Sequence, residues 1–287
     1  MTGACPRCGG AAAPWAHARD RTGGPGTAVL RCAACGTGWT DGPGRATPAA
    51  PGQAPDGVLG AVALRLARAE LRRLLPGLAP GDLVVDVGAG AGLRSAALAA
   101  LGARVVAVEP DGAEAVRARS HAAGGVHVVT ASLQGLPDAL THADAVVCWH
   151  VLEHMDDPAA ALAAMRGLLR PGGVLVVAVP NAGGADARLL GGRWQGWEPA
   201  RHRRHFTACT LGREVAEAGL DRVEVRARGG WFPPLGLACS LMPGIDPQTG
   251  GNPLAAVAAS LLVTPVAAAA AWMGAGPQLV ARARRPG

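Results

Sequence analysis

The chain has 287 residues, which is enough for one large α/β domain and a small additional module. It is 49% hydrophobic, all of its 27 basic residues are arginine, and its formal net charge is +6. That charge permits contact with nucleic acid or an anionic membrane but does not require it, because basic residues cluster densely only at 201–204 and 282–285. A solvated arginine-rich surface is the simpler interpretation.

The amino-terminal residues lack the apolar segment of a secretory signal, which favours a cytoplasmic location. Seven cysteines in such a chain are expected to be reduced thiols or metal ligands rather than a disulfide framework. Peripheral membrane contact and a homodimer remain open alternatives at this point.

Residues 1–40 carry two CxxCG turns, one with Cys5 and Cys8 and the other with Cys32 and Cys35. Each turn places two thiolates on one side of a tight loop, and the following glycine supplies backbone freedom. Two such loops make a closed tetrahedral four-sulfur site, so we predict a structural zinc ribbon. The 23 residues between the pairs exceed the usual spacing and suggest an inserted β-hairpin. A redox pair is the alternative, but it would not need a second copy.

Residues 41–57 are rich in Pro, Gly and Ala and are predicted to form a linker to a domain at 58–287. Short β-branched runs there alternate with helical patterns at the spacing of βα units. Strands are expected at 83–88, 104–109, 126–130, 144–149 and 174–179, which are apolar throughout as in a covered parallel sheet, and at 221–228, which alternates like a strand nearer the edge. Helices are expected at 58–75, 91–101, 111–122, 157–169 and 208–218.

The segment 84–92, VVDVGAGAG, is a strand that runs into a glycine turn and then a helix. Glycines let the backbone approach a ligand closely, and a helix amino terminus favours a negative group. Glu109 lies 21 residues past Gly88, at the end of the next strand, where a carboxylate can accept both hydroxyls of a ribose. The third glycine of a dinucleotide fingerprint would fall at Leu93, and Asp86 has no role with a pyrophosphate, so a different nucleoside ligand is favoured.

Four motifs in order, VVDVGAGAG, VVAVEP, AVVCWHVLEHMDDP and LLRPGGVLVVAVPN, resemble the motif set of class I S-adenosylmethionine-dependent methyltransferases. More narrowly, they are similar to a small-molecule group that includes the ubiquinone-biosynthesis O-methyltransferases. The resemblance covers roughly residues 80–228. It implies an α/β fold with a Rossmann-like, seven-stranded, mostly parallel sheet, and S-adenosyl-L-methionine as the cofactor.

The resemblance also implies a role for individual positions around the cofactor. The glycine turn would wrap the amino-acid end, Glu109 would bind the ribose, and the residues after the second and third strands would contact the adenine. The tip of the fourth strand would line the methyl-transfer face. The implied cofactor-binding residues are Asp86, Gly88, Ala89, Gly90, Gly92, Glu109, Pro110, Asp111, Ser132, Leu133, Trp149 and His150.

His150, Glu153 and His154 follow the HxxEH spacing of inverted zinc peptidases. That chemistry needs both histidines on one helix, whereas this segment begins at a strand tip within the methyltransferase motifs. We therefore favour a structural role in which Glu153 and His154 fix the loop after the strand. A metal-assisted O-methyltransferase that uses the same two residues is the alternative.

Segment 194–207 is the densest cluster of aromatic and histidine residues in a chain that is only 3% aromatic. Its position after the fifth strand resembles the substrate-covering segment of the family. Histidine is the side chain best suited to accept a proton near neutral pH, so His202 or His205 is a candidate base or substrate ligand. His150 is the third candidate catalytic residue. Packing or capping roles for the two loop histidines remain the alternative.

Residues 247–281 contain no charged side chain, and 254–273 reaches the length of a membrane span. The many alanines, the central Pro265 and the strand-like sequence that follows favour instead a helical pair, inserted at about 247–276 before the last strand. Buried packing, interfacial lipid contact and a true span are the three alternatives.

The most consistent function is methyl transfer to a small-molecule acceptor, with lipid-linked and secondary-metabolite acceptors included. A zinc-ribbon rRNA methyltransferase is one alternative, and a non-catalytic zinc-ribbon binding protein is another. Four cysteines without a histidine, together with segment 194–206, favour a small molecule over nucleic acid. The intact residues Asp86, Gly88, Gly90 and Glu109 argue against the non-catalytic alternative.

Overall fold

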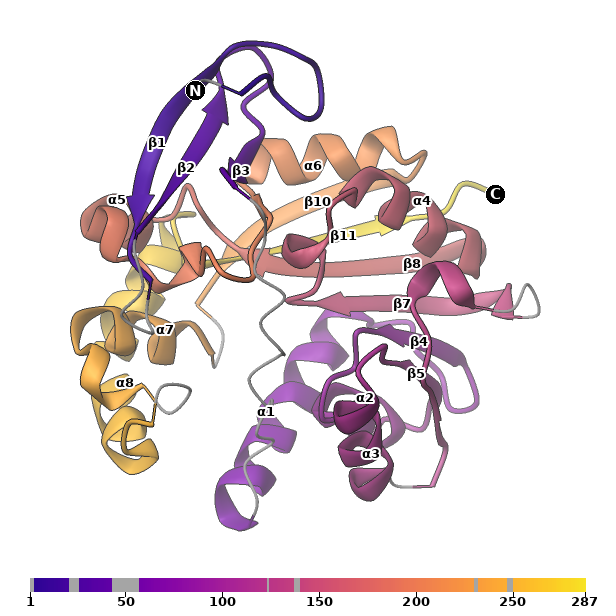
Figure 1. The fold of residues 1–287 in the computed structure, drawn as a ribbon. Coiled ribbons are helices and arrows are strands. Elements are labelled where there is room, and N and C mark those ends of the chain that lie inside the picture. The colour runs from indigo at the N-terminus through magenta and orange to yellow at the C-terminus, as the bar shows by residue number, and fades with distance from the viewer. Residues whose placement is uncertain are drawn as a thin grey trace.

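The protein contains two β-sheets, shown with the helices around them in Figure 1. The computed structural model describes residues 3–20, 26–42, 57–122, 124–136, 140–229, 232–246 and 250–287. One sheet has four strands in the order β1-β2-β3-β9, and the other has seven in the order β10-β11-β8-β7-β4-β5-β6. The predicted linker lies outside the described residues except at its two ends.

The small sheet is antiparallel and combines distant parts of the chain. Its first three strands, β1 (Ala12–Ala18), β2 (Thr27–Cys32) and β3 (Gly38–Thr40), form a hairpin with a short third strand. The fourth, β9 (Arg204–His205), pairs with β3 and comes from the loop that precedes α6. The amino-terminal module is therefore continuous by hydrogen bonding with the main body of the protein.

The large sheet is mostly parallel, which confirms the predicted fold class. The pairs β4–β5, β5–β6, β4–β7 and β7–β8 are parallel, and β11 is antiparallel to both β8 and β10. The alternating segment 221–228 forms β10, and it lies at the edge as its pattern predicts. The strands are β4 (Leu83–Val87), β5 (Arg104–Val108), β6 (Val126–Val129), β7 (Ala143–Trp149), β8 (Leu169–Pro180), β10 (Asp221–Arg228) and β11 (Gln278–Arg284).

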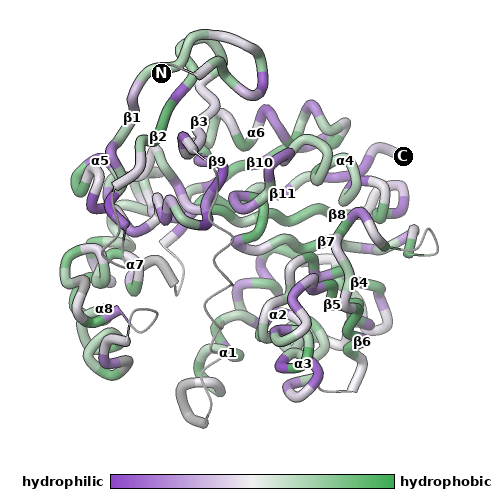
Figure 2. The backbone as a smooth tube through the Cα atoms, viewed as in Figure 1, coloured by the Kyte–Doolittle hydropathy of each residue, from purple (hydrophilic) through white to green (hydrophobic). Residues whose placement is uncertain are grey.

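Helices cover both faces of this sheet. Because each strand is apolar on both sides, alternate residues of one strand belong to different core clusters: Val84 lies in the cluster that includes residues of α1 and α2, and Val85 in the cluster that includes residues of α4 and α6. Figure 2 shows this hydrophobic character along the central strands. The helices are α1 (Gly57–Leu74), α2 (Leu93–Ala99), α3 (Gly112–His121), α4 (Pro158–Leu168), α5 (Ala185–Leu190), α6 (Ala208–Glu217), α7 (Phe232–Leu241) and α8 (Pro253–Trp272), with 3-10 turns η1 (Leu133–Gly135), η3 (Leu152–His154), η4 (Gly191–Arg193), η5 (Gln195–Trp197) and η6 (Pro243–Ile245).

The apolar insert differs from the expected helical pair at 247–276. It begins earlier, with α7, and the charge-free stretch itself forms the single helix α8 rather than two helices. Pro265 does not end α8, because the helix continues for seven further residues to Trp272. The two helices that form the insert are therefore α7 and α8, which lie between β10 and β11 in the chain.

The amino-terminal module packs on the main body of the protein through charged and aromatic contacts. Arg7 pairs with Glu214 of α6 at 2.8 Å, and Arg213 of the same helix donates to the backbone oxygen of Cys35 at 2.6 Å. On the other side of the small sheet, the Trp15 ring lies edge-on to Trp197, with ring centroids 5.3 Å apart. These contacts hold the module against α6 and segment 194–206.

Thr40 is the polar centre of this contact. Its hydroxyl donates to the backbone oxygen of His202 at 2.7 Å, so it accepts from the protonated Nε2 of His205 at 2.9 Å. Thr40 and both histidines are buried. Both bonds are therefore shielded from water.

We expect Thr40→Val to lower the free energy of unfolding by about 2–4 kcal/mol, because it leaves two buried polar groups without partners at about 1–3 kcal/mol each. Urea denaturation measures this change. Thr264→Val is the matched control, because Thr264 is exposed and its hydroxyl donates to the Ser260 oxygen of its own helix. Equal losses in the two variants would contradict the assigned role of Thr40.

Candidate active site

The glycine turn after β4 has the geometry of a ligand cradle. Gly88, Gly90 and Gly92 have φ angles of 70°, 53° and 85°, in the left-handed region that favours glycine. A Cβ on Gly88 would lie 2.3 Å from a methyl of Val151, whereas a Cβ on Gly90 would meet no described atom within 4 Å. Gly88 is therefore required by packing, while Gly90 faces open space into which a ligand can approach the backbone.

Asp86 orders the turn from beneath. Its carboxylate is buried and accepts a 2.6 Å hydrogen bond from the Ser95 hydroxyl, which ties β4 to α2. Burial raises the pKa of Asp86, and the bond from Ser95 opposes that shift. This contact allows the carboxylate to order the start of α2 next to the glycine turn.

Glu109 lies directly after β5 and faces the same turn. One carboxylate oxygen accepts from the Gly90 amide at 2.8 Å, and the other from the Asp111 amide at 2.9 Å. Burial raises the pKa of Glu109, and these two backbone bonds lower it. Each oxygen has a second lone pair, so the carboxylate is held in place with acceptor capacity left for a ribose.

The neighbouring predicted residues lie around this carboxylate with different local roles. The Ala89 amide donates to the Val108 oxygen, which closes the turn against β5. Asp111 uses its side chain to cap α3, accepting from the amides of Ala113 and Glu114. Pro110 connects β5 to that cap, and Ser132 and Leu133 begin the η1 turn after β6.

Trp149 ends β7, and its ring is covered by the Arg94 guanidinium at 3.9 Å from the ring centroid. Burial lowers the pKa of Arg94 to about 10, although Glu70 and Asp86 oppose the shift. Arg94 lies 3.8 Å from Glu70 of α1. Sequence reasoning missed Arg94 and Glu70. The sequence signal for Arg94 was its place in the first turn of α2. The helix dipole disfavours positive charge there, so an arginine at that position indicates a special role.

His150 follows Trp149 with a positive φ of 55°, an unusual conformation for a non-glycine residue. Its Nδ1 lies 3.2 Å from a carboxylate oxygen of Glu153, and its Nε2 lies 3.2 Å from the amide oxygen of Gln278. Strained residues of this kind cluster at functional sites. Both ring nitrogens are thus held, and His150 lies directly after β7. The next residue, Val151, is the one that packs against Gly88.

Glu153, His154 and His202 form a compact group of potential metal ligands. One ligand atom from each lies within 4.8 Å of the others. His154 Nδ1 is 3.2 Å from the Arg201 oxygen and His202 Nδ1 is 2.9 Å from the Gly196 oxygen, so both rings present Nε2 for coordination. Burial raises the pKa of Glu153, but the bond with His150 and the nearby histidines outweigh it and hold the pKa at about 2.

His205 is placed differently from the other candidate catalytic histidines. It is buried beneath Trp197, with ring centroids 5.0 Å apart, and its Nε2 is engaged by Thr40. Burial lowers its pKa to about 3. Such a ring is a weak proton acceptor, and its contacts belong to the junction with the amino-terminal module. Segment 194–206 therefore serves partly as the docking surface of that module.

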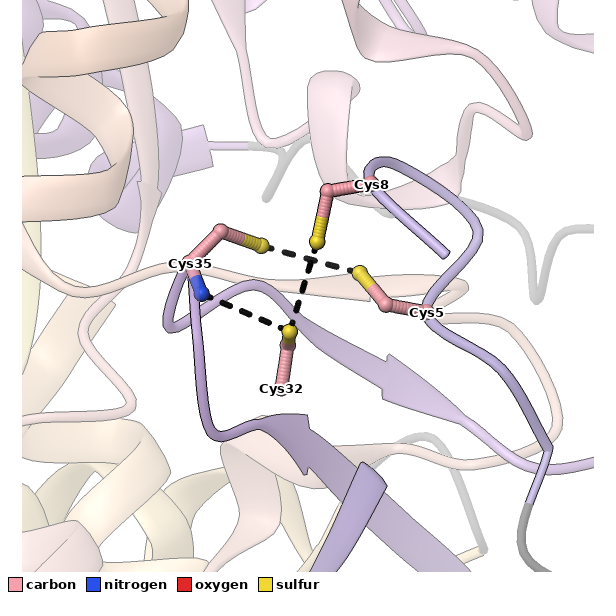
Figure 3. Close-up of side chains that lie close together, drawn as sticks. All are labelled: Cys5, Cys8, Cys32 and Cys35. Carbon is pink, nitrogen blue, oxygen red and sulfur yellow. Dashed lines mark hydrogen bonds between the residues drawn. The ribbon is translucent and has the colours of Figure 1, made fainter. Parts of the chain in front are cut away.

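The four cysteines of the CxxCG turns converge, as Figure 3 shows. The Sγ atoms of Cys5 and Cys35 are 3.6 Å apart, and those of Cys8 and Cys32 are 3.5 Å apart. A zinc ion with 2.3 Å bonds to sulfur requires tetrahedral edges of about 3.8 Å, so the arrangement fits the ion. The Cys35 amide points at the Cys32 sulfur at 3.4 Å, as in a site built for thiolates.

Comparison with known proteins agrees with this geometry. Residues 61–225, more than half of the chain, match the family described as a methyltransferase domain. Ubiquinone biosynthesis O-methyltransferases are 39% identical over 106 residues in Xanthomonas campestris and 40% identical over 105 residues in Xylella fastidiosa. These stretches cover 36% and 35% of this chain and 44% and 43% of the relatives, so the match spans less than half of those proteins.

Solved structures show the same fold at low sequence identity. The [4+2]-cyclase SpnF is similar with a TM-score of 0.55 and 21% identity, covering 87% of this chain and 86% of its own. Phosphoethanolamine N-methyltransferase 2 of Haemonchus contortus, in complex with S-adenosyl-L-methionine, has a TM-score of 0.54 and 15% identity, covering 78% and 53%. The chain belongs to the methyltransferase-domain family, within the class of S-adenosylmethionine-dependent methyltransferases.

We expect one zinc ion per chain in protein purified without chelator, because the four thiolates form a closed site. Elemental analysis measures it, and Cys5→Ser combined with Cys32→Ser is expected to remove the metal. Cys209→Ser combined with Cys239→Ser is the matched control, since these thiols lie outside the cluster. Metal-free wild type, or a cluster variant that keeps its zinc, would refute the site.

Proposed function

We propose that the protein transfers the methyl group of S-adenosylmethionine to a small-molecule acceptor. The observation that carries this proposal is the pairing of Glu109 with the Gly90 amide at 2.8 Å, which fixes a ribose-binding carboxylate over an open glycine turn. Donor binding would use the turn, the residues around Pro110 and Asp111, and the η1 turn at Ser132 and Leu133. The O-methyltransferase relatives support an oxygen acceptor.

Catalysis in this proposal depends on position more than on acid–base chemistry, because the sulfonium of the donor is already activated. Trp149 and His150 would line the methyl-transfer face. His150 is the candidate catalytic residue that would orient the acceptor, since its half-buried ring is held by Glu153 and Gln278. His202 would act indirectly, because burial lowers its pKa and its Nδ1 is committed to the Gly196 oxygen.

The rRNA alternative is less well supported by the placement of the amino-terminal module. The Trp15 ring packs edge-on against Trp197 and is covered by Arg31, whose guanidinium carbon lies 5.0 Å from the ring centroid. Protein contacts of this kind compete with stacking of the ring on a base. The similarity to a cyclase shows that this fold can support other chemistry, so methyl transfer must be measured directly.

We expect Glu109→Ala to weaken S-adenosylmethionine binding at least about tenfold, because the ribose loses charge-assisted hydrogen bonds of about 1.5–3 kcal/mol. Isothermal calorimetry measures the affinity. Asp221→Ala removes an exposed carboxylate at the start of β10 and serves as the control. Equal affinity in wild type and Glu109→Ala would overturn the assignment of this carboxylate.

Metal-assisted transfer is a second candidate mechanism, favoured by the group formed by Glu153, His154 and His202. These residues supply one carboxylate and two imidazoles, a set that suits a divalent transition metal. A bound ion would act as a Lewis acid on an acceptor oxygen. Without a metal, the same group still holds the loop between β7 and α4 against segment 194–206. The backbone oxygen of Glu153 accepts a hydrogen bond from the Arg203 amide.

We expect wild type that carries one zinc ion per chain to bind Mn²⁺ and His154→Ala to lose that binding, because one of three ligands is removed. Electron paramagnetic resonance of free Mn²⁺ measures it. His127→Ala, on the exposed side of β6, is the control. Absence of Mn²⁺ binding in wild type, or unchanged binding in His154→Ala, would refute a metal site at this cluster. Its residues would then have only a structural role.

A further inference from the structure

Helix α8 is long, apolar and mostly exposed. Its segment Leu254–Trp272 has a mean hydropathy of 2.1 and is long enough to cross a membrane, yet only 17% of its most apolar window is buried in the protein. Of the three alternatives left open for this segment, buried packing is the one that its exposure contradicts. Figure 2 shows the hydrophobic colouring along α7 and α8 at the margin of the molecule.

The large side chains of α8 gather on one side. Leu261, Leu262 and Trp272 are 68%, 80% and 90% exposed. The buried side consists of alanines that pack toward the body, including Ala267, whose oxygen lies beside Gly229 at the end of β10. We call the outward side the apolar face; its large members are Leu254, Leu261, Leu262, Val266, Trp272 and Met273.

The two side-chain hydroxyls of α8 and the first amides of the helix have hydrogen-bond partners within the helix or its cap. The Ser260 hydroxyl donates to the Ala256 oxygen at 2.6 Å, and the Thr264 hydroxyl donates to the Ser260 oxygen at 2.7 Å. Asn252 caps the first turn by accepting from the amides of Leu254 and Ala255. Internal satisfaction of this kind is what a hydrocarbon environment demands, whereas a protein interface usually has a polar rim.

A basic groove lies near the base of the same insert. It has a volume of about 280 Å³ and is lined by arginines from α1, β10 and β11, with Glu224 among them. Arg226 and Arg228 belong to β10, which leads directly into Gly229 and its contact with α8. In Figure 1, α7 and α8 lie below the amino-terminal hairpin, in the lower part of the view together with α1. The four arginines are Arg73, Arg226, Arg228 and Arg282.

We propose that the apolar face of α8 inserts into the surface of an anionic lipid bilayer, with the basic groove binding lipid headgroups. An uncharged face beside clustered arginines matches the two layers of such a surface, the acyl region and the negative headgroups. Two weak signals act together, since neither an apolar face nor a few arginines alone anchors a protein stably.

This surface also bears on the acceptor, an extension that rests on the proposed methyl transfer. The Gln195 amide donates to the Ser240 hydroxyl of α7 at 2.8 Å, and Gln195 begins the η5 turn next to Trp197. The insert thus contacts the segment that carries His202. An acceptor with an apolar tail dissolved in the bilayer would reach the protein on the side of this segment.

Flotation with vesicles tests the proposal. Wild type is expected to float with vesicles of phosphatidylglycerol and phosphatidylcholine at low salt, and much less with phosphatidylcholine alone. Leu262→Glu is expected to reduce the floated fraction at least about tenfold, because it places a charge in the acyl region. Val116→Glu is the matched control, since Val116 is a 62% exposed apolar residue of α3. Arg226→Glu is expected to reduce flotation only on the anionic vesicles.

Three results would overturn the proposal. One is a wild type that stays in the bottom fraction with both vesicles, and another is Leu262→Glu floating as well as wild type. The third is a dimer in sedimentation equilibrium that Leu262→Glu converts to monomer in the absence of lipid, which would make a second copy the occupant of the face. Flotation requires no methyl transfer, so Glu109→Ala is expected to float like wild type, and a failure of docking remains distinct from a failure of donor binding.

Discussion

The structure around the candidate site depends on one buried charge, the carboxylate of Glu153. A carboxylate that is 1% exposed is unfavourable unless cations or donors surround it. Here the surrounding groups come from separate segments: the His150 ring at the tip of β7 lies 3.2 Å from one carboxylate oxygen, and His202, in the loop before α6, has its Nε2 4.0 Å from the same oxygen. Satisfying this charge therefore fixes the end of the central strand against a loop that is 50 residues away in sequence.

The same loop connects the site to the amino-terminal module. Thr40 binds the backbone oxygen of His202 and the ring of His205, while β3 pairs with Arg204 and His205 directly. The module that carries the four-cysteine site thus contacts the backbone from which His202 projects. A metal bound by these cysteines would affect the candidate site through structure and not through its chemistry.

Much of the large sheet could be predicted because parallel strands covered on both faces are apolar without interruption, and these runs are visible in the sequence. The turn at Gly88 and the carboxylate at Glu109 were accessible for the same reason, since strand ends locate them. The strand β9 could not be predicted, because two residues carry no pattern and pair only with a partner from the other end of the chain. The exposure of α8 was equally hidden, because a helix that is apolar all round does not show which side faces the protein.

The pairing of β3 with β9 has a consequence for the order in which the protein acquires its structure. Thr40 and His205 are 165 residues apart, so the fourth strand of the small sheet becomes available only after most of the large sheet has been synthesised. The cysteine turns, by contrast, are complete within the first forty residues and can bind metal early. Contacts of such high sequence separation form slowly because of the entropy of closing the intervening loop. The nascent chain must therefore carry a three-stranded metal module with an unpaired edge until residues 204–205 emerge to cover it, and that interval is when it is most exposed to wrong partners.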